Sequence, residues 1–401
     1  MAVTNTRSAW LPLAITLAIQ ALVAMAVLTP PVIAPVLARA FGLSVTYLGL
    51  YIAIVYLGAM LASLAAGAAV ARFGAIRVSQ VGLLLCAAGI LMCATASLWT
   101  FALGALLIGL GYGPITPASS WLLALTTPAH RMSLVFSIKQ TGVPVGGMLA
   151  GAVVPSVMLL AGWQGALVAV AVANVLCAVV AQPLRAGLDA DREPGKPLRL
   201  GNLVQPIRLV LSQRTLATLA ACSFVFSTAQ LVLTGYLVTY LSQVLAYGLV
   251  MAGLALSVAQ MGGIGGRIVW GYIADRGLGA KRTLAALAFI MAGSSLATAL
   301  LHTSMPAVLV FAILFVFGAS ATGWNGVYLA EVARRAPPGM AGIATGGTLA
   351  ITFLGVVVGP PVFGAVSAAM GSLRFGYAAL ALPVLVCAVV LMRSRTQPAV
   401  G

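Results

Sequence analysis

The stretch GYIADRGLGAKR, residues 271–282, is the polar joint between two long apolar runs, 249–274 and 283–301. Each run is long enough to cross a hydrocarbon core of about 30 Å as an α-helix. The joint carries one acid, Asp275, and several basic residues. This pattern predicts two membrane-spanning helices whose connection lies in water on one side of the bilayer.

Apolar runs of the same kind recur along the whole chain of 401 residues. Hydrophobic residues make up 62% of the chain and charged residues 6%, whereas a soluble domain carries about 25% charged residues. We therefore predict an all-α integral membrane protein with 12 transmembrane helices, because a helix satisfies its own backbone hydrogen bonds in lipid. The expected helices are 11–36, 45–71, 78–96, 101–125, 133–158, 166–182, 216–240, 249–274, 283–301, 307–331, 340–366 and 376–392.

The net charge of +16 could suggest a nucleic-acid partner, but the placement of the basic residues argues against one. With the amino terminus in the cytoplasm, nearly all of them fall at cytoplasmic helix ends, and Arg39 and Arg374 fall outside. We therefore expect a multi-pass protein of a cell membrane, such as a bacterial inner membrane, with both termini in the cytoplasm.

One segment, residues 185–214, is rich in Pro and Gly and holds three of the five acids of the chain. It divides six expected helices from six. We predict an N-terminal six-helix bundle over 1–184, a cytoplasmic linker over 185–214 and a C-terminal six-helix bundle over 215–401.

The two halves show a weak internal repeat. An offset of 204 positions places Gly58 on Gly262 and Arg72 on Arg276, at corresponding places in the two predicted bundles. The economical interpretation is a duplicated bundle.

The joint resembles the loop signature of the major facilitator superfamily, in which Gly, three residues, Asp and Arg precede a Gly and a basic cluster. The matching positions are Gly271, Asp275, Arg276, Gly279, Lys281 and Arg282. A degraded copy, GAAVARFGAIR at 67–77, has Ala71 in place of the acid. The resemblance implies two pseudo-symmetric six-helix bundles around a central cavity that opens to one side of the membrane and then to the other.

The resemblance also implies a gate, in which acids at cytoplasmic helix ends pair with nearby basic residues and hold the inside closed. Asp275 and Glu331 are the acids outside the linker segment. We expect the gate to comprise Asp275, Arg276, Glu331, Arg72, Lys281 and Arg282.

Lys139 and Arg267 lie well inside their apolar runs, where a cation is costly unless it faces protein or water. The resemblance places their helices in opposite bundles, so the two cations could converge on one anion. The alternatives are that Lys139 reaches the inner interface and that Arg267 is structural. The other expected substrate-binding residues are Gln140, Gln230, Asn325, Trp324 and Tyr328.

These residues favour a secondary transporter of a small organic anion, a carboxylate, loosely similar to the oxalate and monocarboxylate branches of that family. Coupling would be anion exchange or symport of a proton, with Glu331 as the protein's candidate. The alternative is an exporter of neutral or amphiphilic compounds, and a membrane sensor or lipid-moving protein is a third class. GxSxG, HExxH and phosphate-loop patterns are absent from the sequence, so we expect no catalytic residues. We also expect a monomer that binds no metal or cofactor.

Overall fold

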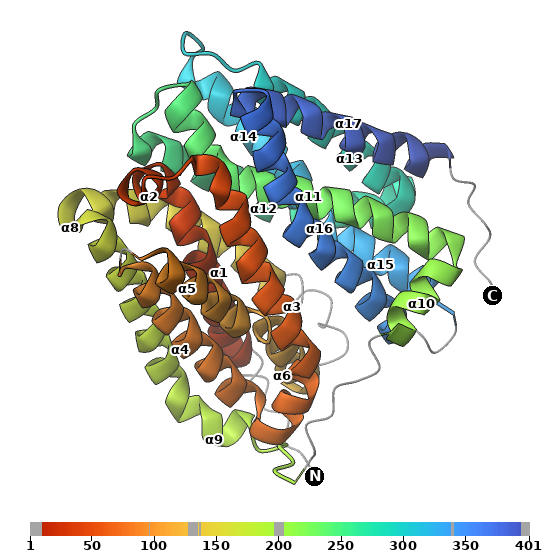
Figure 1. Cartoon of the computed structure of the whole chain (residues 1–401). Coiled ribbons are helices and arrows are strands. Elements are labelled where there is room, and N and C mark those ends of the chain that lie inside the picture. Colours follow the sequence, from red (N-terminus) through yellow and green to blue (C-terminus); the bar gives the residue numbers. More distant parts are fainter. Residues whose placement is uncertain are drawn as a thin grey trace. The chain divides into compact units, whose positions relative to one another are not determined.

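The computed structural model describes residues 10–95, 97–126, 135, 138–195, 204–337 and 341–393. Within these residues every regular element is a helix, and the chain divides into two compact units (Figure 1). Unit 1 comprises Met1–Gly42 and Ile54–Gly201, and unit 2 comprises Leu43–Ala53 and Asn202–Gly401.

In unit 1, α1 packs on α8, and α4 packs on both α5 and α8. The helix α3 (Leu48–Phe73) begins within unit 2 and continues in unit 1. The other elements of unit 1 are α1 (Trp10–Val32), α2 (Ala34–Phe41), α4 (Ala75–Cys93), α5 (Leu98–Tyr112), α6 (Ile115–Thr126), α8 (Gly142–Ala181), η3 (Gln182–Leu184) and α9 (Arg185–Leu188).

In unit 2, the closest helix pairs are α13 with α17, α11 with α16, and α12 with α14. A short π-helix, η4 (Ala274–Leu278), joins α12 to α13 within the polar joint 271–282. The elements of unit 2 are η1 (Val45–Tyr47), α10 (Val204–Ser212), α11 (Arg214–Val244), α12 (Leu249–Ile273), η4, α13 (Gly279–Ala299), α14 (Ala307–Ala321), α15 (Asn325–Arg335), α16 (Ala341–Ala369) and α17 (Leu373–Arg393).

Ten segments of the described residues are long and apolar enough to cross a membrane. Two of them, Ile138–Leu188 and Leu249–Ala299, have 51 residues each and turn at a glycine in the left-handed region, Gly162 with φ 73° and Gly279 with φ 73°. Each of these two segments therefore holds two of the predicted helices. The predicted all-α fold of twelve spans is confirmed.

Two of the predicted spans are broken, which the apolar pattern did not indicate. The helix expected at 101–125 stops after α5 because Pro114, at the break, has no N–H to donate. The helix expected at 307–331 is interrupted at 322–324 between α14 and α15. There the Thr322 carbonyl accepts a hydrogen bond from Arg267 Nε at 3.0 Å, so a side chain of α12 satisfies the backbone at the break.

Glycines allow close contact between corresponding helix pairs, α3 with α5 in unit 1 and α12 with α14 in unit 2. A Cβ added to Gly58 or Gly109 would meet the backbone of the opposite helix, α5 or α3 respectively. In unit 2, a Cβ on Gly262 or Gly318 would likewise meet the backbone of α14 or α12. Since the sequence repeat pairs Gly58 with Gly262, the close helix approach that small residues permit is itself repeated.

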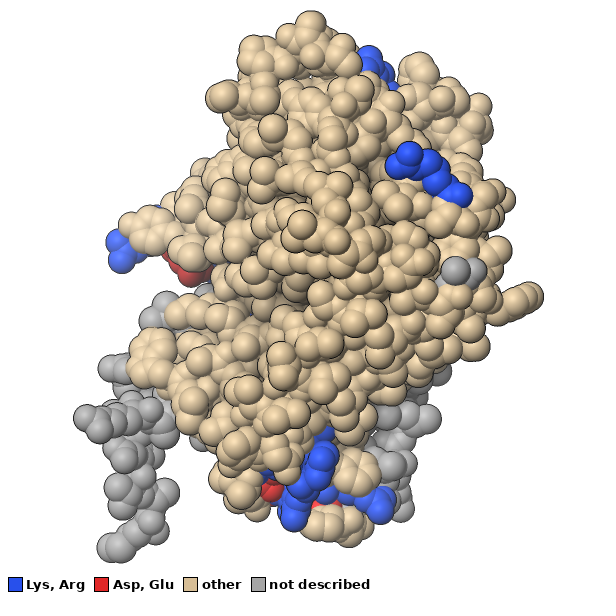
Figure 2. Space-filling model, turned by 90° about the vertical axis from the view of Figure 1, so that its left-hand side faces the viewer, with Lys and Arg blue, Asp and Glu red and all other residues tan. Residues whose placement is uncertain are grey.

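Large apolar side chains lie on the outer surface, as expected of a protein whose solvent is lipid. Trp99, Leu160 and Val308 are 84%, 89% and 82% exposed. Figure 2 shows a face on which Lys, Arg, Asp and Glu are confined to the periphery around a wide uncharged area.

Candidate functional site

Lys139 is fully buried in unit 1, within the short helical stretch 138–140. Its neighbour Ile138 packs on a buried cluster of Leu13, Leu123 and Val135. A lysine that is 0% exposed differs from one that reaches the membrane interface, where its ammonium group would be hydrated. The burial of Lys139 therefore favours the functional interpretation over the interfacial one.

A second polar group, Gln20 of α1, lies near the start of α8 in unit 1. Gln20 of α1 is buried against Gly142, three residues after Lys139, and its Oε1 accepts a hydrogen bond from Thr116 Oγ1 at 3.2 Å. Its Nε2 has no hydrogen-bond partner among the residues that the structure describes. Gln20 is not among the site residues predicted from sequence, because its position against Gly142 is a tertiary contact.

In unit 2, Arg267 lies half-buried beside the break between α14 and α15. Besides the bond from Arg267 Nε to the Thr322 carbonyl, Trp270 Nε1 donates to the Ala319 carbonyl at 3.0 Å. These bonds hold α12 against the end of α14. The guanidinium of Arg267 is thus positioned close to the start of α15, which carries three of the predicted site residues: Trp324 at its N-cap, Asn325 and Tyr328.

The predicted amide and aromatic residues of unit 2 do come together. Asn325 Nδ2 donates to Gln230 Oε1 at 3.3 Å, which joins α15 to α11. The ring of Trp324 makes edge contacts with Phe226 at 5.6 Å and with Tyr328 at 5.3 Å between ring centroids. Both Trp324 and Tyr328 are 1% exposed.

The Tyr328 hydroxyl faces a group of hydroxyl side chains on α11 and α16, namely Ser223, Thr348 and Thr352. Thr352 Oγ1 donates to Ser223 Oγ at 2.7 Å, whereas the Tyr328 oxygen has no hydrogen bond of ordinary geometry within the described part of the chain. A phenol enclosed without such a bond is costly, so it is available to a polar group of a ligand.

The predicted residues Lys139 and Gln140 belong to unit 1, where Gln140 is half-buried. Because Lys139 lies in unit 1 and Arg267 in unit 2, their convergence on one anion stays a prediction.

The six expected gate residues have diverse surroundings. Glu331 is 6% exposed and forms ion pairs within its own helix, with Arg334 at 3.3 Å and Arg335 at 2.9 Å. Asp275 is exposed, and Arg276 donates from Nη1 to the Tyr272 hydroxyl at 3.1 Å. The remaining residues are Arg72, which lies over the Phe73 ring at 5.4 Å, and Lys281 and Arg282 in the first turn of α13.

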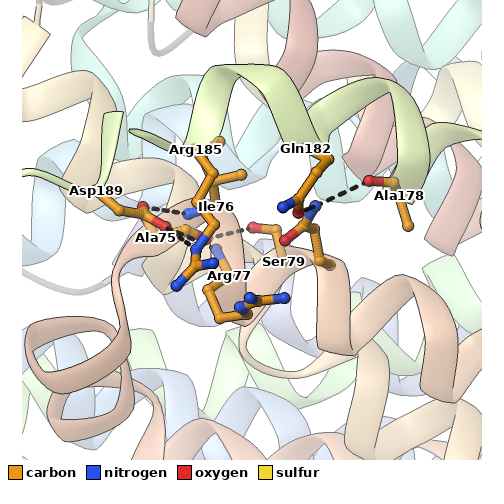
Figure 3. A network of polar contacts seen from close by, with 9 residues as sticks. Ala75, Ile76, Arg77, Ser79, Ala178, Gln182, Arg185 and Asp189 are labelled. Carbon is orange, nitrogen blue, oxygen red and sulfur yellow. Dashed lines mark hydrogen bonds and ion pairs between the residues drawn. The ribbon is translucent and has the colours of Figure 1, made fainter. Parts of the chain in front are cut away.

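The structure adds a carboxylate that sequence reasoning assigned only to the linker. Asp189, 3% exposed, accepts hydrogen bonds from the backbone N–H groups of Ile76 at 2.8 Å and Arg77 at 3.0 Å (Figure 3). The helix α4 starts there after Gly74, which has φ 93° and no side chain to cap it. Asp189 therefore caps α4 from a distant part of the chain.

Further contacts hold the same segment against unit 1. The Glu193 N–H donates to the carbonyl of Ala71 at 2.7 Å, and Trp121 Nε1 donates to Asp191 Oδ2 at 2.7 Å. Ala71 is the position where the degraded signature lacks its acid. The start of the predicted linker thus supplies acidic groups and backbone contacts around this loop.

We expect Asp189→Asn to destabilise the protein by about 1–2 kcal/mol, because an amide retains one acceptor oxygen, loses the charge and leaves one buried N–H unsatisfied. The melting temperature of purified protein should fall by several degrees. Asp191→Asn is the control, since Asp191 is exposed and should change the melting temperature much less. Equal melting temperatures for wild type and Asp189→Asn would show that this cap does not stabilise the fold.

Comparison with known proteins agrees with this architecture. The family model described as Major Facilitator Superfamily matches residues 14–360. A gentisate transporter of Corynebacterium glutamicum is 27% identical over 329 residues, which cover 76% of this chain and 70% of the relative.

Solved structures with a similar fold include a bacterial homologue of the human lysosomal transporter Spinster in an inward-facing, occupied conformation. Its TM-score is 0.74 at 17% identity, with 96% of this chain and 98% of that chain covered. A D-xylose–proton symporter has a TM-score of 0.73 at 18% identity, with coverage of 96% and 97%. Such low identities show a shared fold and leave the substrate open.

Proposed function

Because the chain belongs to the major facilitator superfamily of membrane transporters, we propose that it carries a small organic anion, a carboxylate, across the membrane by alternating access. The observation that carries this proposal is the full burial of Lys139, three residues before Gly142, which packs against Gln20. A buried cation together with an amide that has a donor to spare suits a carboxylate, which only accepts hydrogen bonds.

The aromatic cluster of unit 2 supports a carboxylate that also has a ring. Three aromatic rings contact one another there, since Trp324 makes edge contacts with Phe226 and with Tyr328. The similarity to a gentisate transporter points in the same direction, since gentisate is an aromatic carboxylate with hydroxyl groups. In our proposal, Lys139 binds the carboxylate, and the aromatic cluster of unit 2 is the candidate surface for a ring.

Substrate binding would also affect transport. A ligand that binds one conformation more tightly than another shifts the equilibrium between them, so occupancy would bias alternating access. We further propose that coupling uses either anion exchange or a proton. The two ion pairs of Glu331 with arginines of its own helix favour a structural or gate role for this acid over a proton-carrying role.

The direct test is ligand-dependent stabilisation of the purified protein. Gentisate, benzoate and oxalate are screened beside a sugar, an organic cation and a neutral aromatic alcohol. We expect at least one carboxylate to raise the melting temperature in a concentration-dependent manner, because a ligand that binds the native state stabilises it. Stabilisation by the neutral or cationic compounds alone would contradict the proposal.

One observation favours the alternative, an exporter of neutral or amphiphilic compounds. Arg267 Nε is already bonded to the Thr322 carbonyl, as a structural arginine would be. The buried aromatic rings would then provide the main contacts with an apolar ligand. The same screen separates the two functions, because an exporter of this kind would respond to the neutral aromatic compound.

A further inference from the structure

We propose that a basic cavity in unit 2 binds the phosphate group of an acidic membrane phospholipid. The cavity has a volume of about 860 Å³ and lies between the start of α13 and the ends of α15 and α17. None of the residues that we propose for substrate binding lines it. The cavity does include Lys281, Arg282 and Glu331 of the expected gate, but the inference does not depend on which substrate the protein carries.

The charge of the lining residues is strongly unbalanced. Glu331 is the one acid in the lining, and its carboxylate already bonds Arg334 and Arg335. The five cationic side chains that line the cavity are Lys281, Arg282, Arg334, Arg335 and Arg393. A cavity with this excess of positive charge suits an anion with several acceptor oxygens, such as a phosphate.

The cations are also close to one another. Lys281 and Arg282 are adjacent in the first turn of α13, and Arg334 and Arg335 both bond the carboxylate of Glu331, so these four cations share one cavity with one acid. Crowded like charges destabilise a fold unless a counter-ion neutralises them. A bound phosphate would relieve this repulsion.

The other side of the cavity is apolar and faces outward. Phe289 of α13 and Met392 of α17 line it and are exposed, as is Leu278 just before α13. Leu278 precedes α13 and Met392 lies at the end of α17, whereas Phe289 lies halfway along α13, so the apolar side extends from the level of the lipid headgroups toward that of the acyl chains. A ligand with a phosphate and an adjoining hydrocarbon chain fits both sides, whereas inorganic phosphate fits one.

The site lies on the side where α13 begins and α17 ends, which the positive-inside rule predicts to be cytoplasmic. Basic pockets between helices on that side are suited to acidic lipid headgroups. The phosphate would contact Lys281, Arg282 and Arg393, which carry no ion pair to a carboxylate among the described residues that line the cavity.

The experiment measures melting temperature and bound lipid, so failure of the transport hypothesis does not affect it. Purified protein is titrated with phosphatidylglycerol, phosphatidylcholine or inorganic phosphate. We expect phosphatidylglycerol alone to raise the melting temperature by several degrees and to remain bound in native mass spectrometry. The variant Lys281→Gln/Arg282→Gln/Arg393→Gln should lose both effects.

A charge-matched control is Arg192→Gln/Arg208→Gln/Arg214→Gln, which removes three exposed cations outside the cavity. Retained lipid stabilisation in this control, with loss in the cavity variant, supports the site. Equal losses would indicate general surface attraction, and equal stabilisation by inorganic phosphate would indicate a soluble ligand; either result overturns the proposal. If the triple cavity variant does not fold, Arg393→Gln alone, at the exposed end of α17, should still reduce the retained phosphatidylglycerol.

Discussion

Lys139→Gln is expected to reduce carboxylate uptake about 30-fold or more in vesicles that contain equal amounts of folded protein. Removing one partner of a buried, hydrogen-bonded charge pair costs about 2–5 kcal/mol of binding free energy, and about 1.4 kcal/mol corresponds to tenfold. Lys139 is 0% exposed, so water cannot replace its ammonium group at the carboxylate. The measurement is the initial rate of uptake of the carboxylate identified by thermal shift, as a function of its concentration.

Two control variants make this result specific. Lys139→Arg keeps the charge and should retain a substantial part of the uptake. Arg39→Gln removes an exposed cation of the same unit and should leave uptake unchanged. Full uptake by Lys139→Gln at normal membrane yield would refute the anion site.

Arg267→Gln distinguishes the two interpretations of Arg267. If Arg267 binds substrate, uptake per folded molecule falls as it does in the Lys139 variant. If Arg267 only supports the break at Thr322, the melting temperature falls because a backbone carbonyl loses its donor, while uptake per folded molecule is retained.

Gly318→Leu is expected to destabilise unit 2 by about 3 kcal/mol or more, at the upper end of the effects of overpacking. Any Cβ at this position would meet the carbonyl and Cα of Ala259 in α12, and backbone atoms cannot rotate away as a side chain can. The two helices must separate. We expect little monodisperse protein after purification and a strongly lowered melting temperature for the remainder.

The matched control is Gly293→Leu. Gly293 also lies inside a helix, α13, but a Cβ there would meet no atom within 4 Å, and the position is exposed. The same substitution should therefore leave yield and melting temperature close to wild type. Comparable losses in both variants would mean that the effect comes from the glycine-to-leucine exchange itself and not from helix contact.

The breaks in the spans at 113–114 and 322–324 differ in how far the sequence could predict them. Pro114 gave a local signal for the first break. The second depends on Arg267, which is 55 residues distant in sequence from the Thr322 carbonyl that it supports. A pattern of apolar residues contains no information about such a contact.

The candidate site was predictable only in part, because single residues can be recognised in a sequence whereas contacts between helices cannot. Lys139 and Arg267 stood out because cations are rare within apolar runs, and Trp324, Asn325 and Tyr328 follow from their position in one span. The contact of Asn325 with Gln230 joins two helices and could only be observed in the fold. The same holds for Gln20, whose contact with Gly142 comes from the packing of α1 on α8.

The joint at 271–282 and the apolar runs around it determined the number of spans, the helical class and the family from sequence alone. Lipid imposes a requirement that is local along the chain: about 20 apolar residues for each crossing, with charges kept to the ends. The tertiary structure alone decided that Asp189 caps α4, 113 positions away in sequence from Ile76. It also decided that five cations surround one cavity, because the start of α13 and the ends of α15 and α17 come together only after the helices have packed.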